Sequence, residues 1–414
     1  MKTIKFYTLG CKVNQYDTQS IRERFLSRGF REILNGAKAN VCLINTCTVT
    51  ASADQKSRNI IRRLARENPK AQVIITGCMV NKDQGALAAI KGVELIVDKK
   101  FFPDGITDFS GHTRAFLKIQ DGCDNSCAYC KVPLVRGRSR SRSICDVAME
   151  ADTLAQKGHK EIVLTGICLG AYGRDLKPKT SLAKLICKLE KIEGLERIRL
   201  SSIEAGDVTE ELIDKLSKSP KLCQHLHIPI QSGDDKILKL MRRRYTRKYY
   251  LHLISLLRRK IPDISITTDV MVGFPGESEE NFNNTLRLIR AISPLKAHIF
   301  PYSARPGTVA LGLGSVIPPE IIRRRAGRLR LLAERYSLEF KKRFLKRVMP
   351  VLIESRAGDS RAFWEGHTGN YLKARTRSRL DLSGSVLPVK LIRLKKDCFY
   401  GELPKIAGCS HQAD

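Results

Sequence analysis

The sequence predicts a mixed α/β protein with an N-terminal parallel α/β domain, a partial β/α barrel and a small C-terminal all-β barrel. Three observations predict this fold class. A length of 414 residues is enough for about two to four domains. Short apolar runs alternate with helical patterns through most of the chain, and the last part has strand patterns with no room for helices between them. We place the domains at residues 1–108, 109–340 and 341–408.

The first domain is predicted from strand-like runs that alternate with amphipathic basic helices. The strand candidates are Ile4 to Leu9, Val41 to Asn45 and Val73 to Thr76, and helix-like segments occupy residues 20–28 and 57–66. This alternation is typical of a parallel βαβ sheet.

The second domain repeats the same alternation and predicts a partial or complete β/α barrel. In such folds the chemistry lies at the carboxyl ends of the strands, and Gly, Ser and Gln residues gather at those ends in this sequence. The strand candidates are residues 115–119, 161–165, 198–201, 225–228, 265–270 and 297–300.

The third domain follows a basic helical segment at residues 320–347. Its short strand candidates are separated by Gly, Ser and Asp residues, which favours a small all-β barrel of about 60 residues. The strand candidates are residues 348–354, 371–376, 386–391 and 399–403.

Charge and cysteine content limit the class of protein. The chain has 74 Lys and Arg residues against 42 Asp and Glu residues, a formal net charge of +32, which favours nucleic acid first and an anionic membrane surface second. Basic residues interrupt every apolar run before the ~18 residues that a membrane span needs, so we expect no spanning helix. The 13 scattered cysteines favour reduced thiols and metal ligation in a cytoplasmic protein.

Cys123, Cys127 and Cys130 form a Cys-x3-Cys-x2-Cys run directly after the first predicted barrel strand. Three thiolates on one loop can hold three irons of a [4Fe-4S] cluster and leave the fourth iron open to a chelating molecule. The alternative is a structural zinc knuckle, which needs four ligands at short spacing. The spacing and the place after the first strand favour the cluster.

Cys11, Cys47 and Cys78 each follow the end of a predicted parallel strand. The carboxyl ends of parallel strands lie along one edge of a sheet, so these distant residues can converge there. Three buried core cysteines are the alternative, but loop-forming residues precede each of them, which favours a second three-thiolate cluster. The other cysteines lack partners at ligand spacing and are expected to be structural. They are Cys42, Cys145, Cys168, Cys187, Cys223, Cys398 and Cys409.

Two motifs resemble those of a known superfamily. The run Cys123-Asp-Asn-Ser-Cys127-Ala-Tyr-Cys130 resembles the signature of radical S-adenosylmethionine enzymes, and Gly273-Phe-Pro-Gly-Glu277 resembles their glycine-rich cofactor loop. The three upstream cysteine segments resemble the methylthiotransferase domain of one subfamily, and the C-terminal strands resemble the RNA-binding TRAM domain. Within the subfamily, Lys12-Val13, Thr48-Val49-Thr50 and Arg305-Pro-Gly-Thr308 are most similar to the tRNA threonylcarbamoyladenosine methylthiotransferases.

The resemblance implies two [4Fe-4S] clusters and two molecules of S-adenosylmethionine. One methyl group goes to a sulfur held by the auxiliary cluster, and the second cofactor is cleaved to a 5′-deoxyadenosyl radical that abstracts hydrogen from adenine C2. The implied product is 2-methylthio-threonylcarbamoyladenosine beside the tRNA anticodon, with a low-potential flavodoxin or ferredoxin as electron donor. An unactivated aromatic C–H has no acidic proton, so we assign no catalytic acid or base.

The resemblance also implies a cofactor pocket at the strand ends, where each candidate could equally be a turn residue. Tyr129 is expected to pack against the cluster loop and the adenine. The other candidate cofactor-binding residues are Thr165, Gly166, Ser202, Gln231, Asp269 and Gly273.

Basic and aromatic residues point to RNA. The phosphate contacts expected nearest the chemistry are Arg136, Arg138, Arg140 and Arg142. In the third domain the basic residues that favour RNA are Lys373, Arg375, Arg377 and Arg379. Phe363, Trp364 and Tyr371 could stack on bases, with at least one of them expected in the core instead.

Three alternatives stay open. The same enzyme could act on isopentenyladenosine in tRNA or on an aspartate of a ribosomal protein. A zinc-dependent RNA-binding protein without catalysis is the third alternative, and its purified form would contain no iron and no acid-labile sulfide.

Overall fold

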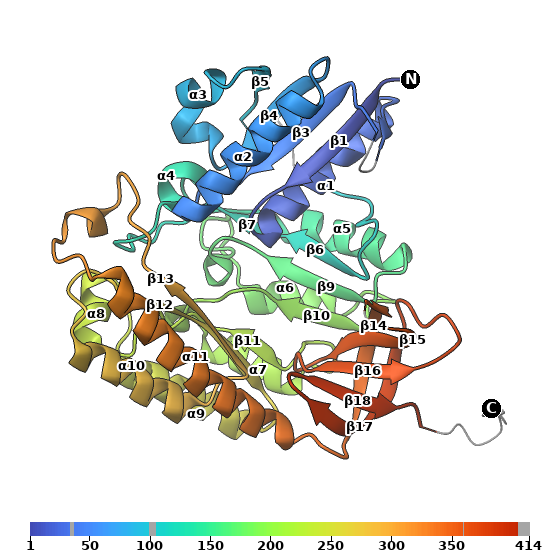
Figure 1. Cartoon of the computed structure of the whole chain (residues 1–414). Helices are drawn as coiled ribbons and strands as arrows, with labels where there is room; N and C mark the ends of the chain where they lie inside the picture. Colours follow the sequence, from blue (N-terminus) through green and yellow to red (C-terminus); the bar gives the residue numbers. More distant parts are fainter. Residues whose placement is uncertain (34–36, 99–104, 359, 405–414) are drawn as a thin grey trace.

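The computed structural model describes residues 1–33, 37–98, 105–358 and 360–404. Figure 1 shows an N-terminal sheet domain at the top, a β/α barrel below it and a small β barrel beside the lower part. The predicted mixed α/β class is therefore confirmed. The predicted domain end at residue 408 and Cys409 lie outside the described residues.

The N-terminal part is a parallel sheet in the strand order β2-β1-β3-β4-β5. Apolar side chains of α2 and α3 pack on one face, and α1 packs on the other. The three predicted strands are confirmed, and the short strands β2 and β5 were not predicted. The elements are β1 (Thr3–Thr8), α1 (Lys12–Ser27), β2 (Arg31–Glu32), β3 (Val41–Thr46), α2 (Ala51–Glu67), β4 (Gln72–Gly77), α3 (Val80–Ala88) and β5 (Val93–Ile96).

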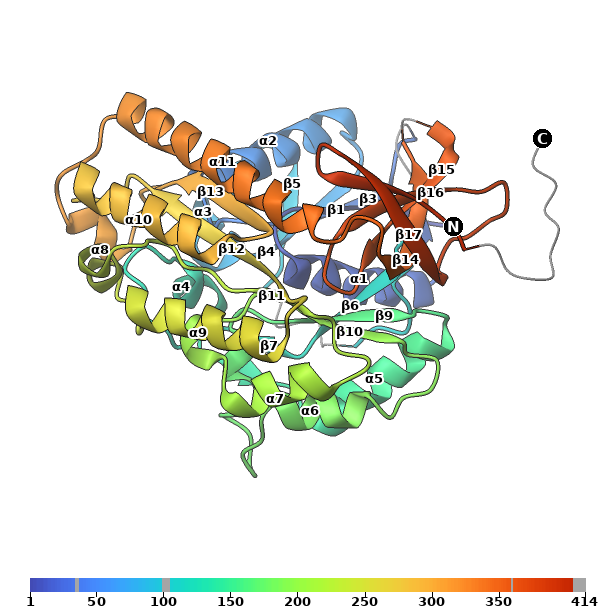
Figure 2. The ribbon, with the colours of Figure 1, turned by 90° about the horizontal axis from the view of Figure 1, so that it is seen from below.

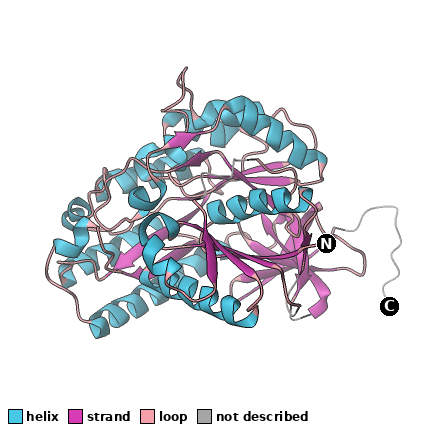
Figure 3. Ribbon diagram, turned by 90° about the horizontal axis from the view of Figure 1, so that it is seen from above, coloured by secondary structure: helices cyan, strands magenta, loops and turns pink. Residues whose placement is uncertain are grey.

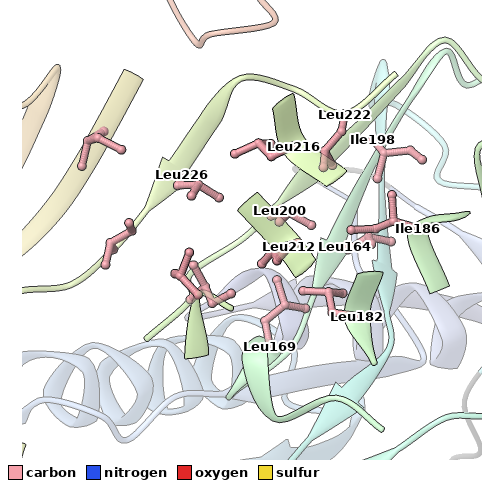
Figure 4. Close-up of a cluster of buried hydrophobic side chains, with 14 of the residues drawn as sticks. Leu164, Leu169, Leu182, Ile186, Ile198, Leu200, Leu212, Leu216, Leu222 and Leu226 are labelled. Carbon is pink, nitrogen blue, oxygen red and sulfur yellow. The ribbon is translucent and has the colours of Figure 1, made fainter. Parts of the chain in front are cut away.

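The central part is a partial barrel of parallel strands. Strands β6, β9 and β10 form one sheet and β11, β12 and β13 another, and a parallel bridge between Ser202 and His227 joins the two. Figure 2 shows the helices along the outer side of these strands, and Figure 3 shows the same arrangement from the opposite side. Buried Leu and Ile side chains of strands and helices fill the space between them (Figure 4). All six predicted strands are confirmed to within two residues at each end.

The strands of this part alternate with helices whose starts are capped as their sequences suggest. Ser278 forms a capping box with Asn281, and the Thr209 side chain accepts a hydrogen bond from the Leu212 N–H. The elements are β6 (Arg114–Lys118), β7 (Gln120–Asp121), α4 (Val132–Arg136), β8 (Arg140–Ser141), α5 (Ile144–Gln156), β9 (Glu161–Thr165), α6 (Leu182–Leu189), β10 (Arg197–Leu200), α7 (Glu210–Lys218), β11 (His225–His227), α8 (Asp235–Leu240), α9 (Arg247–Lys260), β12 (Ser265–Val272), α10 (Glu279–Ile292), β13 (Lys296–Pro301) and α11 (Pro319–Lys342).

The C-terminal part is a closed barrel in the strand order β14-β15-β16-β18-β17. Four of its strands were predicted, and β15 was missed. Trp364 on β15 is 4% exposed and belongs to the barrel core, which confirms that one of the aromatic residues is a core residue. The elements are β14 (Val348–Ala357), β15 (Ser360–Thr368), β16 (Lys373–Arg377), β17 (Val386–Lys395) and β18 (Cys398–Glu402).

This small barrel packs beside the amino ends of the central strands (Figure 1). Arg199 of β10 donates to the Glu161 carboxylate at 2.6 Å and to the backbone carbonyl of Thr368 at 3.2 Å. The ring of Tyr371 lies between those of His225 and His367, with centroids 4.7 and 4.9 Å away. The interpretation of Tyr371 as a base-stacking residue was therefore wrong, because its ring is part of the junction between the two barrels.

None of the helices in the described ranges combines the length and the apolar composition that crossing a bilayer requires.

Candidate functional site

The structure places the three N-terminal cysteines at the carboxyl ends of β1, β3 and β4. Cys11 is the N-cap residue of α1 and is exposed, whereas Cys47 and Cys78 are 7% and 4% exposed. The loop that carries Cys11 runs directly beside Cys47, because a Cβ atom on Gly10 would lie 3.0 Å from the Cys47 Sγ atom. The side-chain amide of Asn14 donates to the backbone carbonyls of Leu9 and Thr46 and so links the loops that follow β1 and β3.

Burial first, and the neighbouring Cys78 and Cys11 to a smaller extent, raise the pKa of the Cys47 thiol to about 11. The three thiols therefore lie close enough to interact electrostatically. A metal ion or cluster displaces such thiol protons when it binds, so the raised pKa is compatible with a ligand role. On the barrel side, the Nε atom of Arg136 donates to the Cys78 Sγ atom at 3.1 Å.

Cys123, Cys127 and Cys130 lie on one half-buried loop after β6 and β7. The Cys123 N–H donates to the carbonyl of Gly137 at 3.0 Å, and the Cys130 N–H donates to the carbonyl of Cys127 at 3.0 Å. Burial raises the pKa of the Cys130 thiol to about 12. A hydrogen bond with the Cys168 thiol lowers the pKa of Cys123 to about 7.

Cys168 was expected to be structural or incidental, and the structure places its thiol beside the Cys123 loop. Its thiol contacts Cys123 and accepts a hydrogen bond from the Asn125 side chain at 3.5 Å. Cys168 lies after β9, a different strand from the one that precedes the Cys123 loop, so no sequence spacing could indicate the contact.

Arg243 is a second residue that sequence reasoning missed. Its guanidinium donates to the Cys127 Sγ atom at 3.2 Å and to the Tyr129 hydroxyl at 3.3 Å, and it forms an ion pair with Glu204. In the sequence it is one arginine of a long basic run, with nothing to separate it from its exposed neighbours.

The candidate cofactor residues differ in whether their polar groups already have partners in the protein. Gln231 lies at a strand end with φ of 64°, and its Oε1 atom is buried with no hydrogen-bond partner among the described residues. Asp269 lies within β12 and pairs with His227 at 3.1 Å, whereas Thr165 donates its hydroxyl to the carbonyl of Val163. Of the remaining candidates, Gly166 packs beside Gln120. Ser202 forms a parallel β-bridge with His227, and the Gly273 N–H donates to the Glu277 carboxylate.

The buried polar atoms at these strand ends fit a polar cofactor. Ser201 lies beside Ser202, and its Oγ atom, like Oε1 of Gln231, is buried with no hydrogen-bond partner within the described ranges. Buried polar groups are almost always paired, so such atoms are suited to receive the polar groups of a ligand.

A single hydroxyl group joins the two cysteine loops. Oγ1 of Thr48, the residue after Cys47, accepts hydrogen bonds from Lys131, the residue after Cys130, at 3.0 Å and from Arg305 at 3.2 Å. The two sets of cysteines therefore belong to one region between the N-terminal sheet and the carboxyl ends of the barrel strands. In the part of the chain that the structure describes, no group of three His, Cys, Asp or Glu side chains is arranged to hold a single metal ion. A [4Fe-4S] cluster binds each thiolate through a different iron.

Two of the predicted phosphate contacts were wrong. Arg136 is buried and donates to both carboxylate oxygens of Asp121 at 2.9 and 3.1 Å. Arg142 pairs with Glu150 at 2.5 Å. Both guanidinium groups are engaged by carboxylates inside the protein, while Arg138 and Arg140 are exposed.

Comparisons with known proteins identify the class to which this fold belongs. Residues 117–289 match the Radical SAM superfamily, and residues 3–98 match the Uncharacterized protein family UPF0004. A radical S-adenosylmethionine methyltransferase, TsrM, from Kitasatospora setae has a similar fold, with a TM-score of 0.55 and 15% identity over 75% of this chain and 77% of that chain. Fold and matched superfamily thus define the class as a radical S-adenosylmethionine enzyme.

Relatives with known names narrow the class. "Threonylcarbamoyladenosine tRNA methylthiotransferase MtaB" of Bacillus subtilis (strain 168) is 37% identical, covering 95% of this chain and 94% of the relative. The protein of the same name from Chlamydia pneumoniae is 36% identical, covering 97% of this chain and 98% of the relative. "tRNA-2-methylthio-N(6)-dimethylallyladenosine synthase" of Clostridium tetani is 32% identical over 95% of both chains. The chain belongs to the radical S-adenosylmethionine methylthiotransferase family, whose cofactors are [4Fe-4S] clusters and S-adenosylmethionine.

Proposed function

We propose that the chain adds a methylthio group to C2 of N6-threonylcarbamoyladenosine next to the anticodon of tRNA. The observation that carries this proposal is the meeting of two three-cysteine sets, joined through Thr48, in one region of the molecule. The relatives named for this substrate, at 36 to 37% identity over nearly the whole chain, support the choice of nucleoside.

In this proposal each cysteine set holds one [4Fe-4S] cluster. Cys123, Cys127 and Cys130 hold the cluster that binds S-adenosylmethionine, and the auxiliary cluster is held by the other set, Cys11, Cys47 and Cys78. When bound, these groups supply the radical chemistry and the methylthio sulfur. The chain's own residues bind and orient them.

The proposed contacts to S-adenosylmethionine come from the strand ends. Gln231 offers a buried acceptor, and Arg243 holds Tyr129 and Cys127 in fixed positions. The full set of proposed contacts is Tyr129, Thr165, Gly166, Ser202, Gln231, Asp269 and Gly273.

The proposed partner is the anticodon loop of tRNA, in which the target base can leave its stack at low cost. Arg138 and Arg140 are exposed beside the cysteine loop and are suited to phosphate contacts. In the C-terminal barrel, Lys373 and Arg375 pair with Glu365, so Arg377 is more accessible to RNA than either of them. A low-potential flavodoxin or ferredoxin is the proposed electron donor, and the cytoplasm the proposed location.

We assign separate roles in this reaction to the predicted domains. Residues 1–108 carry the auxiliary cluster, residues 109–340 carry the radical chemistry and residues 341–408 bind RNA. The described residues of the third segment form the closed β barrel at the amino ends of the central strands.

A second candidate substrate is dimethylallyladenosine in tRNA. Relatives named as synthases of the methylthio form of that nucleoside are 32 to 34% identical over most of the chain. The reaction on adenine C2 would be the same, and only the N6 substituent would differ.

Nucleoside mass spectrometry separates the two candidates. The anaerobically reconstituted protein would be incubated with S-adenosylmethionine, dithionite and a mixture of two tRNAs, one with threonylcarbamoyladenosine and one with dimethylallyladenosine. We expect a methylthio product only from the first tRNA, and no product from a Cys127→Ala control. A product only from the second tRNA would overturn the proposed substrate in favour of the second candidate.

A further inference from the structure

Arg136 connects the two cysteine sites from inside the protein. It is the last residue of α4, the short helix that follows Cys130, and its side chain is 1% exposed. From this barrel position its Nε atom donates to the Cys78 Sγ atom of the N-terminal domain at 3.1 Å. We propose that Arg136 is a positioning residue that holds Cys78 and raises the reduction potential of the auxiliary cluster. The inference rests on the proposed function, in which Cys78 is a cluster ligand.

The guanidinium group is held in a fixed orientation by partners on its other nitrogens. Nη1 donates to both carboxylate oxygens of Asp121, and Nη2 donates to the side-chain oxygen of Asn14. Asp17 lies 3.6 Å from Nη2 and pairs with Lys118 at 2.5 Å. Because each of these partners constrains the planar group, its Nε–H is directed at the sulfur.

The charges of this buried group balance without the sulfur. Arg136 and Lys118 carry two positive charges, and Asp17 and Asp121 carry two negative charges. A buried arginine needs such partners because an unpaired charge is costly to bury. The hydrogen bond to Cys78 is therefore not needed to neutralise Arg136, and we assign it to the positioning of the Cys78 sulfur.

A hydrogen bond to a ligand sulfur favours the more negative, reduced state of an iron-sulfur cluster. Hydrogen bonds to the sulfurs and local charge are among the factors that set the potentials of such clusters. Asp121 lies two residues before Cys123, so the same arginine also fixes the start of the second cysteine loop relative to Cys78. The Arg136 side chain thus contacts both Cys78 and the residue two positions before Cys123.

The test compares variants in a full-length background in which Cys123, Cys127 and Cys130 are alanine, so that only the auxiliary cluster remains. Asp121→Asn is compared with the double variant Asp121→Asn/Arg136→Gln, because the pair differs only in Arg136. The double variant also keeps the buried charges balanced. Arg142→Lys is the matched control, since Arg142 is a partly buried arginine that donates to the Glu150 carboxylate, the Tyr16 hydroxyl and the backbone carbonyl of Lys118.

The readout is a reductive titration followed by electron paramagnetic resonance, with iron content measured on the same samples. At a fixed potential, we expect the ratio of reduced to oxidised cluster to fall about tenfold in the double variant, a shift of about 59 mV to more negative potential for one electron. The Arg142→Lys control should keep the potential of its background. Loss of iron in the double variant alone, with iron kept in Asp121→Asn, would equally support the positioning role.

Two results would overturn the inference, and they are distinguishable. Equal potentials and equal iron contents in Asp121→Asn and the double variant would show that Arg136 does not act on the cluster, while the proposed function would stand. A background protein that binds no iron would show that Cys78 is not a cluster ligand, and the proposed assignment would fail with the inference. If neither Asp121 variant folds, Arg136→Lys replaces them, with the same shift expected against Arg142→Lys.

Discussion

The two cysteine sites are built in different ways. Cys11, Cys47 and Cys78 come from three strand ends and meet only when the whole parallel sheet has formed, and two of them are buried. Cys123, Cys127 and Cys130 lie close together in the sequence on one half-buried loop, in which the Cys130 N–H donates to the carbonyl of Cys127. The cysteines of the first site are therefore brought together only by tertiary structure, whereas those of the second are already neighbours in the sequence.

The two sites share one feature, a hydrogen bond from an arginine to a cysteine sulfur. In each of them a largely buried arginine donates a hydrogen bond to one sulfur: Arg136 to Cys78 at 3.1 Å and Arg243 to Cys127 at 3.2 Å. Arg136 reaches across from the other domain, whereas Arg243 comes from the same barrel as its cysteine. The N-terminal cysteine site therefore includes a contact from the barrel, and we expect substitutions on the barrel side to affect it.

The largest effect should come from removing one ligand at each site. Cys127→Ala should abolish cleavage of S-adenosylmethionine, because the cofactor-binding cluster loses a thiolate. Cys47→Ala should spare cleavage and stop methylthiolation. Chromatographic assay of 5′-deoxyadenosine with mass spectrometry of tRNA nucleosides measures both. Loss of cleavage in both variants would show that the sites are not separable.

A smaller but severe effect is expected from Gly122→Ala at the second site. Gly122 has φ of 73°, and an added Cβ atom would lie 1.9 Å from the carbonyl oxygen of Arg138. Gly111→Ala is the matched control, with φ of 78° and open space around its Cβ position. We expect Gly122→Ala to lose about half of the iron, that of one of two clusters, and Gly111→Ala to keep it. Equal iron contents would contradict the close packing of the loop that starts at Gly122.

The corresponding change at the first site is Gly10→Ala. Gly10 has φ of 99°, and its added Cβ atom would lie 2.9 Å from the Cys47 Cβ atom, whereas Gly29, with φ of 81°, has open space. Both variants carry the backbone strain of a left-handed alanine, about 1 kcal/mol. Only Gly10→Ala should also weaken iron binding at Cys47 while cofactor cleavage continues. The same iron content in Gly29→Ala and Gly10→Ala would argue against a cluster beside Gly10.

The smallest effect should follow Thr48→Val, which removes the hydroxyl between the two loops. Lys131 and Arg305 each lose one acceptor, and we expect a loss of about 1 to 3 kcal/mol in the free energy of unfolding. Thr48→Ser keeps the hydroxyl and should lose less. Urea unfolding measures the difference, and equal stability of both variants would show that the hydroxyl does not join the loops.

Sequence patterns predicted the parts of the fold and site that depend on local order. The alternation of strands and helices gave the parallel strands, and the spacing of Cys123, Cys127 and Cys130 marked the loop. Strand β15 was missed, because Gly366 and charged residues interrupt its apolar pattern. A strand that is paired on both sides inside a closed barrel needs no regular alternation to be stable.

The residues that sequence reasoning misjudged are those whose partners are distant in the chain. Arg136 was expected to contact phosphate, but Asp17 and Asp121 pair with it in the folded protein. Tyr371 was considered for base stacking, but His225 of the central barrel covers its ring. A basic run or a lone aromatic residue gives no information about such partners, because the fold brings them together.

The central claim is that the chain has two separate cluster sites, and the most direct test is the iron and acid-labile sulfide content of three proteins. We predict about eight irons per chain in the wild-type protein after anaerobic reconstitution, and about four in each variant that has one cysteine set replaced by alanine. The sets are Cys11, Cys47 and Cys78, and Cys123, Cys127 and Cys130. About four irons in the wild-type protein, with none lost when the first set is replaced, would contradict the account and leave those thiols as core residues.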